Sequence, residues 1–173
     1  WNNEYNYEIG GDIEFPVGPG KLKLIALESF RHGNFRSQSL LDIGTLPTIG
    51  SRYERLSDQG ERIGRAEYAW AMLGGDWQIS AEAAFNRLDN VGSLFLYNDS
   101  ADSFVEIPFP SGIGGVREDR YESILSYGTQ ITPDLSLQRA AGMERSTISQ
   151  TGVAANSRSF RRPKGTLSLA WAA

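Results

Sequence analysis

The sequence predicts an all-β protein, in which about seven long antiparallel strands form a meander that is part of a transmembrane β-barrel. The first observation behind this prediction is an almost unbroken alternation of apolar and polar residues through the segment 77–86. Successive side chains of a strand point to opposite faces, so this segment has one apolar and one polar face. The apolar face consists of Trp77, Ile79, Ala81, Ala83 and Phe85.

The second observation is the length of the strands. The segment 61–87 is typical of a hairpin joined at Gly74-Gly75, and each arm exceeds the length of the usual strand of a globular protein. From Trp77 to Phe85 a strand covers roughly 26 Å, or about 19 Å of height at a 45° tilt. This height is close to that of the lipid-facing band of an outer-membrane barrel.

The third observation is that short and long connections alternate along the chain. Short turns are expected at 16–20, 74–75 and 132–134, and long polar loops at 34–60, 88–117 and 149–162. Bacterial outer-membrane barrels have short periplasmic turns and long extracellular loops. The strands between these connections are expected at about 1–15, 21–33, 61–73, 76–87, 118–130, 135–146 and 164–173. Which face of 21–33 and of 135–146 meets lipid is left open, because Glu28 and Arg139 interrupt their apolar sides.

Aromatic residues gather at the ends of the expected strands. Most lie near the short turns and Phe85 lies at the far end, as in the two aromatic girdles of a membrane barrel. The expected lipid-facing girdle consists of Phe15, Trp70, Trp77, Phe85, Tyr127 and Trp171. A soluble β-sandwich gives no reason for its aromatic residues to gather at one end of every strand.

The opposite faces of the strands are expected to line a wet lumen. The even positions of the first strand carry Glu4, Glu8, Asp12 and Glu14, for which Lys23, Arg65 and Arg120 are candidate partners. Glycosidases use two facing carboxylates, but several on one strand face are more simply a hydrated wall.

Two further expectations concern features that do not fit a regular closed barrel. Arg139 falls on an apolar face, so it should either reach the short-turn side or be turned inward by a bulge near 140–142.

The expected number of strands is odd, so the start of the first strand and the end of the last strand lie on opposite sides of the membrane. Bacterial single-chain barrels have an even number of strands. The sheet is therefore expected to be open, as an incomplete barrel.

Composition excludes several other classes of function. The 173 residues, enough for one domain, carry a net charge of −4 and no cysteine, which argues against a nucleic-acid surface, a disulfide framework or a thiolate site. No apolar run is long enough for a membrane helix. No catalytic site, metal site or cofactor is expected. His32 is the only histidine, and a surface hydrolase that pairs it with Ser29 is a minor alternative to a polar residue at a strand end.

Ligand capture is expected in the loops, where arginine forks could attract an anion. The candidates are Arg117, Arg158, Arg161, Arg162, Tyr97 and Phe104. The alternative is that these arginines pair with loop carboxylates or with lipopolysaccharide phosphates, and that the aromatic residues pack the loop on itself.

Two segments of the hairpin have the sequences Gly60-Glu61-Arg62-Ile63-Gly64-Arg65-Ala66-Glu67-Tyr68 and Asp76-Trp77-Gln78-Ile79-Ser80-Ala81-Glu82. These segments resemble the barrel of TonB-dependent outer-membrane receptors. The segments 115–122 and 167–171 are similar to the same group, especially to its alphaproteobacterial members. The resemblance implies a twenty-two-stranded barrel with an N-terminal plug and a TonB box, which takes up iron–siderophore complexes, cobalamin or sugars. The plug and the TonB box have no matching positions in this chain.

The sequence therefore predicts a non-enzymatic segment of a receptor in the bacterial outer membrane, which takes up a nutrient such as a ferric siderophore. Its expected partners are outer-membrane lipid and lipopolysaccharide, with the plug domain and TonB implied by the resemblance, and no nucleic acid. The alternative is a small structural or binding barrel, either in the outer membrane or as a soluble lipid carrier.

Overall fold

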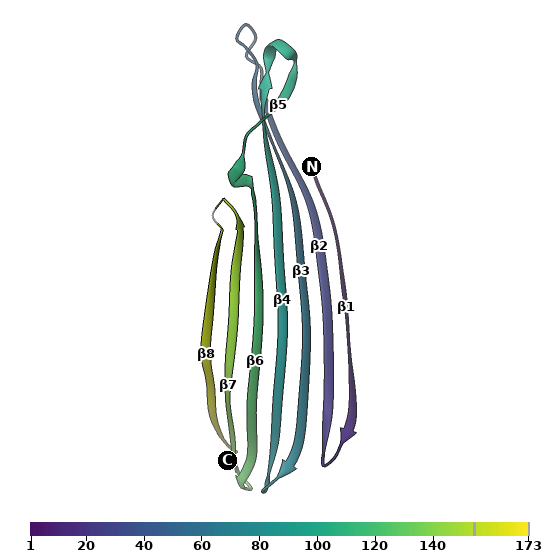
Figure 1. Ribbon diagram of the computed structural model, residues 1–173, viewed down its shortest axis with the longest axis vertical. Coiled ribbons are helices and arrows are strands. Elements are labelled where there is room, and N and C mark those ends of the chain that lie inside the picture. The colour runs from purple at the N-terminus through teal and green to yellow at the C-terminus, as the bar shows by residue number, and fades with distance from the viewer. Residues whose placement is uncertain (154, 173) are drawn as a thin grey trace.

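The computed structural model describes residues 1–153 and 155–172, and they form one antiparallel sheet (Figure 1). The strands follow one another in the order β1-β2-β3-β4-β6-β7-β8, and the short β5 pairs with β4. The long strands are β1 (Asn2–Val17), β2 (Gly20–Leu41), β3 (Ile49–Met72), β4 (Gly75–Asn98), β6 (Ile113–Thr132), β7 (Leu135–Gly152) and β8 (Asn156–Trp171). The short elements are η1 (Asp99–Ala101), β5 (Ser103–Ile107) and η2 (Pro110–Gly112). The predicted meander of about seven long strands is confirmed.

The predicted long loops are wrong in extent, because most of their residues belong to strands. β2 and β3 stay paired from Gly20↔Trp70 up to Leu41↔Ile49, so only residues 42–48 connect them. β7 and β8 likewise leave a short connection where a loop over 149–162 was predicted. Above the apolar band polar and apolar residues mix on both faces of the strands, so the alternation that marks a strand in the sequence disappears while the backbone ladder continues.

The short turns lie together at one end of the sheet, as predicted (Figure 1). All three differ slightly from the predicted bounds, since residues 18–19, 73–74 and 133–134 connect the strands. The turn between β3 and β4 is Leu73-Gly74, because Met72 pairs with Gly75. Both turn residues have positive φ, 55° and 75°, which is the requirement of the tight hairpin turn that suits twisted strands. Gly75 itself belongs to β4.

The register of the sheet places all the predicted girdle residues on one face, which we call the outward face. Trp77 lies opposite Trp70 on one side and opposite Tyr127 on the other. The pairing also settles which residues of β2 and β7 point outward, because Leu22 lies opposite Tyr68 and Arg139 lies opposite Tyr127. The even positions of β2 and the odd positions of β7 therefore share the outward face with Trp77.

Aromatic side chains of the outward face form a continuous row beside the short turns. Trp70 stacks on Tyr68 and on Trp77, with ring centroids 5.3 and 6.2 Å apart, and Trp77 lies 4.6 Å from Tyr127. Arg139 extends the row, because its Cζ lies 4.8 Å from the Tyr127 ring centroid. The ladder of β6 and β7 is regular at 140–142 and shifts only between Gln130 and Thr132, so the predicted inward bulge is wrong.

The sheet is open, as expected from the strand count. β1 and β8 stand at the two ends of the strand order, and among residues 1–153 and 155–172 neither has a second strand partner. β8 ends at the side of the short turns, where Figure 1 marks the C-terminus, and the N-terminus lies toward the opposite end. The last residue of the predicted strand 164–173 lies outside the described residues. In the described part of the chain, no helix is long and apolar enough to span a membrane.

One close approach between strands requires glycine. A Cβ at Gly142 would lie 2.4 Å from the Ser123 carbonyl oxygen, whereas a Cβ at Gly165 on the neighbouring strand would meet nothing closer than 3.8 Å. We expect Gly142→Ala to lower the free energy of unfolding by about 1–3 kcal/mol, because β6 and β7 must separate. Urea unfolding in detergent measures this change, and Gly165→Ala is the matched control with little effect. Equal stability of the two variants would contradict the close packing of β6 on β7.

The faces make a second prediction, which the absence of native cysteine makes easy to test. Nitroxide labels at Ile79→Cys and Ala83→Cys in the full-length protein should collide with oxygen dissolved in lipid. Labels at Ser80→Cys and Glu82→Cys should collide instead with a water-soluble nickel chelate. Accessibility measured by electron paramagnetic resonance separates the two environments, and two equally dry faces would refute the membrane assignment.

Candidate ligand-binding face

The face opposite the aromatic row is polar and carries a network of ion pairs that crosses several strands. At its centre, Glu82 of β4 accepts from Arg120 of β6, with Oε1 3.0 Å from Nη2. Arg65 of β3 lies on the other side, 3.8 Å from Glu82 and 2.7 Å from Glu67. Each strand contributes every second residue to this face, so side chains far apart in sequence meet in one row.

The network continues through β7 and β8. The Glu144 side chain is only 6% exposed, and its Oε2 lies 2.7 Å from Lys164 Nζ. Lys164 also pairs with Glu122, and Arg162 Nη1 lies 3.3 Å from Glu144 Oε1. A carboxylate this buried is tolerated because cations on the neighbouring strand balance its charge.

Three carboxylates of the predicted acidic wall on β1 form ion pairs with β2. Glu4 binds Arg31 at 2.6 Å, Asp12 binds Lys23 at 3.3 Å, and Glu14 binds Lys21 at 3.0 Å. Lys23 is therefore a correct partner prediction. Arg65 and Arg120 are not partners of β1, since they bind the central glutamates described above.

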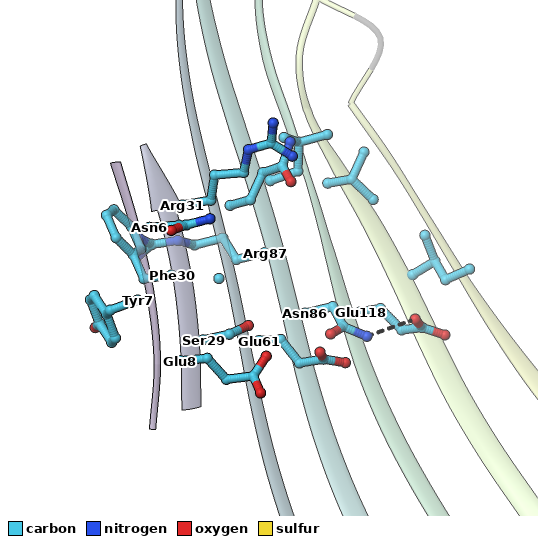
Figure 2. Close-up of a pocket in the computed structure, with 15 residues that line it drawn as sticks. Asn6, Tyr7, Glu8, Ser29, Phe30, Arg31, Glu61, Asn86, Arg87 and Glu118 are labelled. Atoms are coloured by element: carbon cyan, nitrogen blue, oxygen red, sulfur yellow. Dashed lines mark hydrogen bonds between the residues drawn. The ribbon is translucent and has the colours of Figure 1, made fainter. Parts of the chain in front are cut away.

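A hollow of about 750 Å³ lies above this network and is shown in Figure 2. Glu118 is held in place there, because it accepts hydrogen bonds from Asn86 Nδ2 at 3.3 Å and Ser146 Oγ at 2.8 Å. Glu8 of β1 and Glu61 of β3 line the same hollow (Figure 2). The hollow offers carboxylates and amides to a polar ligand or to a file of water.

Aromatic residues stand above the hollow, toward the end of the sheet remote from the short turns. The ring of Tyr53 lies 6.4 Å from Phe35 and 6.2 Å, edge-on, from Phe109. Arg55 covers Phe35 with its Cζ 5.9 Å from the ring centroid. We call these four residues the mouth cluster. Phe35, Tyr53 and Arg55 were missed because 34–60 was taken as a loop. The available signal was the two-residue spacing of Ser51, Tyr53 and Arg55, which places them on one face of a strand.

The predicted ligand-capture residues do not converge, and they lie in strands rather than in loops. Arg117 of β6 and Arg161 of β8 are on the outward face, which they share with Trp77. Arg158 and Arg162 are on the polar face, where Arg162 is engaged by Glu144.

The two aromatic candidates pack on each other at the end of β4. Tyr97 lies opposite Phe104 of β5, with ring centroids 5.3 Å apart. The Tyr97 hydroxyl donates to Asp102, and this hydrogen bond raises the pKa of Tyr97 above its ordinary value. Their contact matches the alternative in which the aromatic residues pack the loop on itself.

His32 faces outward and is not brought together with Ser29. Its Nδ1 lies 2.6 Å from Asp58 Oδ1, and its ring stacks on Tyr5 with centroids 5.1 Å apart. Ser29 is on the polar face, opposite Glu61. The strand alternation therefore separates the two residues that the hydrolase alternative requires.

No protein-family model and no protein of established function matches this sequence. Solved structures match at the level of fold. The ferric citrate transporter FecA aligns with a TM-score of 0.58 and 10% identity over 99% of this chain and 25% of its own. BauA, the ferric preacinetobactin receptor of Acinetobacter baumannii, aligns with a TM-score of 0.63 and 10% identity over 96% of this chain and 28% of its own. FyuA, the ferric yersiniabactin uptake receptor of Yersinia pestis, aligns with a TM-score of 0.53 and 7% identity over 97% and 25%.

The chain thus spans about a quarter of the length of these structures. Its open meander has the fold of part of a transmembrane β-barrel, and the outward face corresponds to the apolar and aromatic side of such a sheet.

The ion-pair network predicts a difference between two lysines. Lys164→Met should lower the urea midpoint of the full-length protein clearly, because it removes one cation from Glu122 and from Glu144, and the Glu144 side chain is almost buried. Lys21→Met should change it little, since Lys21 and Glu14 are 70% and 47% exposed and water replaces the lost pair. An equal effect of the two substitutions would show that the network adds nothing beyond surface pairing.

Proposed function

We propose that this chain is a segment of an outer-membrane receptor that takes up a nutrient, such as a ferric siderophore, by TonB-coupled transport. The observation that carries this proposal is the continuous polar face, which leads from the mouth cluster past the hollow to the ion-pair network. A lumen needs such a hydrated wall on one side of a sheet that is apolar on the other. The fold shared with three ferric-complex transporters or receptors supports the same class of function.

The mouth cluster is the first contact that we assign to the ligand. Tyr53, Phe35 and Phe109 offer ring faces and edges, and Arg55 supplies a positive charge beside them. Aromatic rings and guanidinium groups together suit an anionic complex with an organic shell. Arg158, on the same face of β8, is a second cationic contact on the ligand's path.

The remaining parts of the proposal concern location and partners. The apolar band and its aromatic row support insertion in the bacterial outer membrane, with lipid and lipopolysaccharide around the outward face. A plug domain and TonB would be further partners, in line with the receptor class. The resemblance to alphaproteobacterial members rests on sequence phrases alone, those of the hairpin and those of 115–122 and 167–171.

Uptake of radioactive iron tests the proposed function. Cells that express the full-length protein should accumulate ⁵⁵Fe from at least one of ferric citrate, ferric preacinetobactin and ferric yersiniabactin. Accumulation should saturate with concentration and should stop when a protonophore removes the energy that TonB transmits. Cells that accumulate no more iron than a deletion strain with all three complexes would contradict uptake of ferric complexes of this kind.

Within that assay, Tyr53→Ala should weaken binding of the transported complex about tenfold, because a central aromatic contact is lost. Tyr97→Ala is the matched control, since it removes the same side chain at the same end of the sheet but from the outward face. Binding is measured by competition at 4 °C, where transport is slow. Equal loss in both variants would indicate damage to the upper strands rather than loss of a ligand contact.

A further inference from the structure

Two pairs of arginines lie directly opposite each other on the outward face. Arg145 of β7 is in register with Arg161 of β8, and Arg87 of β4 is in register with Arg117 of β6. Like charges directly opposite on one face of an antiparallel pair are destabilising. All four residues are exposed, so the sheet itself gives no reason for this arrangement.

Few carboxylates balance these charges. Arg87 Nε lies 3.3 Å from Asp89 Oδ2, but in the described parts of the chain no ion pair includes Arg117, Arg145 or Arg161. Asp119 faces the same way, one row from the Arg145–Arg161 pair, and lies opposite Phe85 and Thr147. Asp58, opposite Asp89 on the same face, is engaged by His32, so Asp89 and Asp119 are left beside the four guanidinium groups and the patch is net positive.

A groove of about 680 Å³ begins beside Arg145 of β7 and crosses β6, β4 and β3 as far as Leu24 of β2. Its floor consists of small outward residues from β3, β4 and β6, namely Gly64, Ala66, Ala81, Ala83 and Ser123. Leu24, Tyr121 and Met143 form its sides. A Cβ at Gly64 would meet nothing within 4 Å, so a larger side chain at this position would project into the groove and fill part of it. The groove is therefore apolar and has a cation at one end.

The height of the arginines fits the edge of the hydrocarbon layer. From Leu135 to Arg145 a strand covers roughly 33 Å, which is about 23 Å of height at a 45° tilt. This is close to the ~25 Å apolar band of outer-membrane barrels, at whose edge lipid headgroups begin. Tyr121 and Phe85, edge-on with centroids 5.9 Å apart, mark the same edge from β6 and β4.

We propose that Arg145 and Arg161, with Arg117 and Arg87 beyond them, bind the phosphate of a phosphorylated lipid of the outer membrane, and that one acyl chain of this lipid lies in the groove. A phosphate accepts two parallel hydrogen bonds from each guanidinium and removes the repulsion between the facing arginines. The groove selects a lipid over a free phosphate, because only a lipid has an acyl chain to bury there. This inference rests on the membrane placement in the proposed function but not on iron uptake.

The test uses the purified full-length protein in a neutral detergent, freed of lipid, with lipid A as the probe. Native mass spectrometry and thermal unfolding are recorded for the wild type, for the double variant Arg145→Gln/Arg161→Gln and for Gly64→Leu. Arg158→Gln is the matched control, because it removes an arginine of β8 from the opposite face.

Lipid A should bind the double variant at least about tenfold more weakly than the wild type, and should raise the melting temperature of the wild type only. Without lipid the double variant should melt at or above the wild-type temperature, since the like-charge repulsion is gone. Gly64→Leu should weaken lipid A without changing affinity for inorganic phosphate.

Three results would overturn the proposal. The double variant binds lipid A as well as Arg158→Gln does, or inorganic phosphate displaces lipid A at equal concentration, or Gly64→Leu binds lipid A normally. Iron uptake measured with the same variants distinguishes the two proposals. Lipid binding without uptake would refute only the transport function, and uptake with unchanged lipid binding in the double variant would refute only the lipid site.

Discussion

The fold depends on one backbone ladder that keeps a single two-residue alternation from β1 to β8, with its register shift confined to Gln130–Thr132 beside the β6–β7 turn. In hydrocarbon an unpaired N–H or C=O group costs several kcal/mol, so a sheet that spans a membrane must pair every backbone group. A slip of one residue in any strand would exchange its outward and polar faces. The aromatic row from Tyr68 to Arg139 and the ion pairs around Glu82 both exist because β3, β4, β6 and β7 keep one register through these rows.

The two faces obey different rules. On the outward face, aromatic rings and small residues form an apolar surface. Exposed arginines lie beyond it, farther from the short turns. On the polar face, charges are arranged so that each buried carboxylate touches a cation from a neighbouring strand, as Glu144 does with Lys164. Such a row is stable as a set, and the loss of one member leaves the others poorly compensated.

The fold class and the faces could be predicted from the sequence wherever one face is apolar. Trp77 to Phe85 is such a segment, and its lateral partners follow once the turn is known. Strand length could not be predicted, because β2, β3 and β4 continue into regions where polar and apolar residues mix on both faces. The position of Arg139 beside Tyr127 also depends on register, which a single strand does not encode.

The candidate site was less predictable than the fold. The sequence marks arginines and aromatic residues, but which of them share a face depends on pairing across strands. Arg158 and Arg161 are close in sequence, yet the alternation of β8 places the first on the polar face and the second on the outward face. Tyr53 was hidden in an apparent loop, and only its register with Ser37 and Leu94 reveals that it stands with Phe35 and Phe109.

The most direct measurement of the central claim is the quenching of Trp77 fluorescence by brominated lipids. The full-length protein would carry Trp77 as its only tryptophan and would be placed in vesicles brominated at defined depths. The account predicts strong quenching by bromines near the headgroup end of the acyl chain and little quenching by aqueous iodide. Quenching by iodide and indifference to every brominated lipid would contradict a membrane-spanning sheet with this face in lipid.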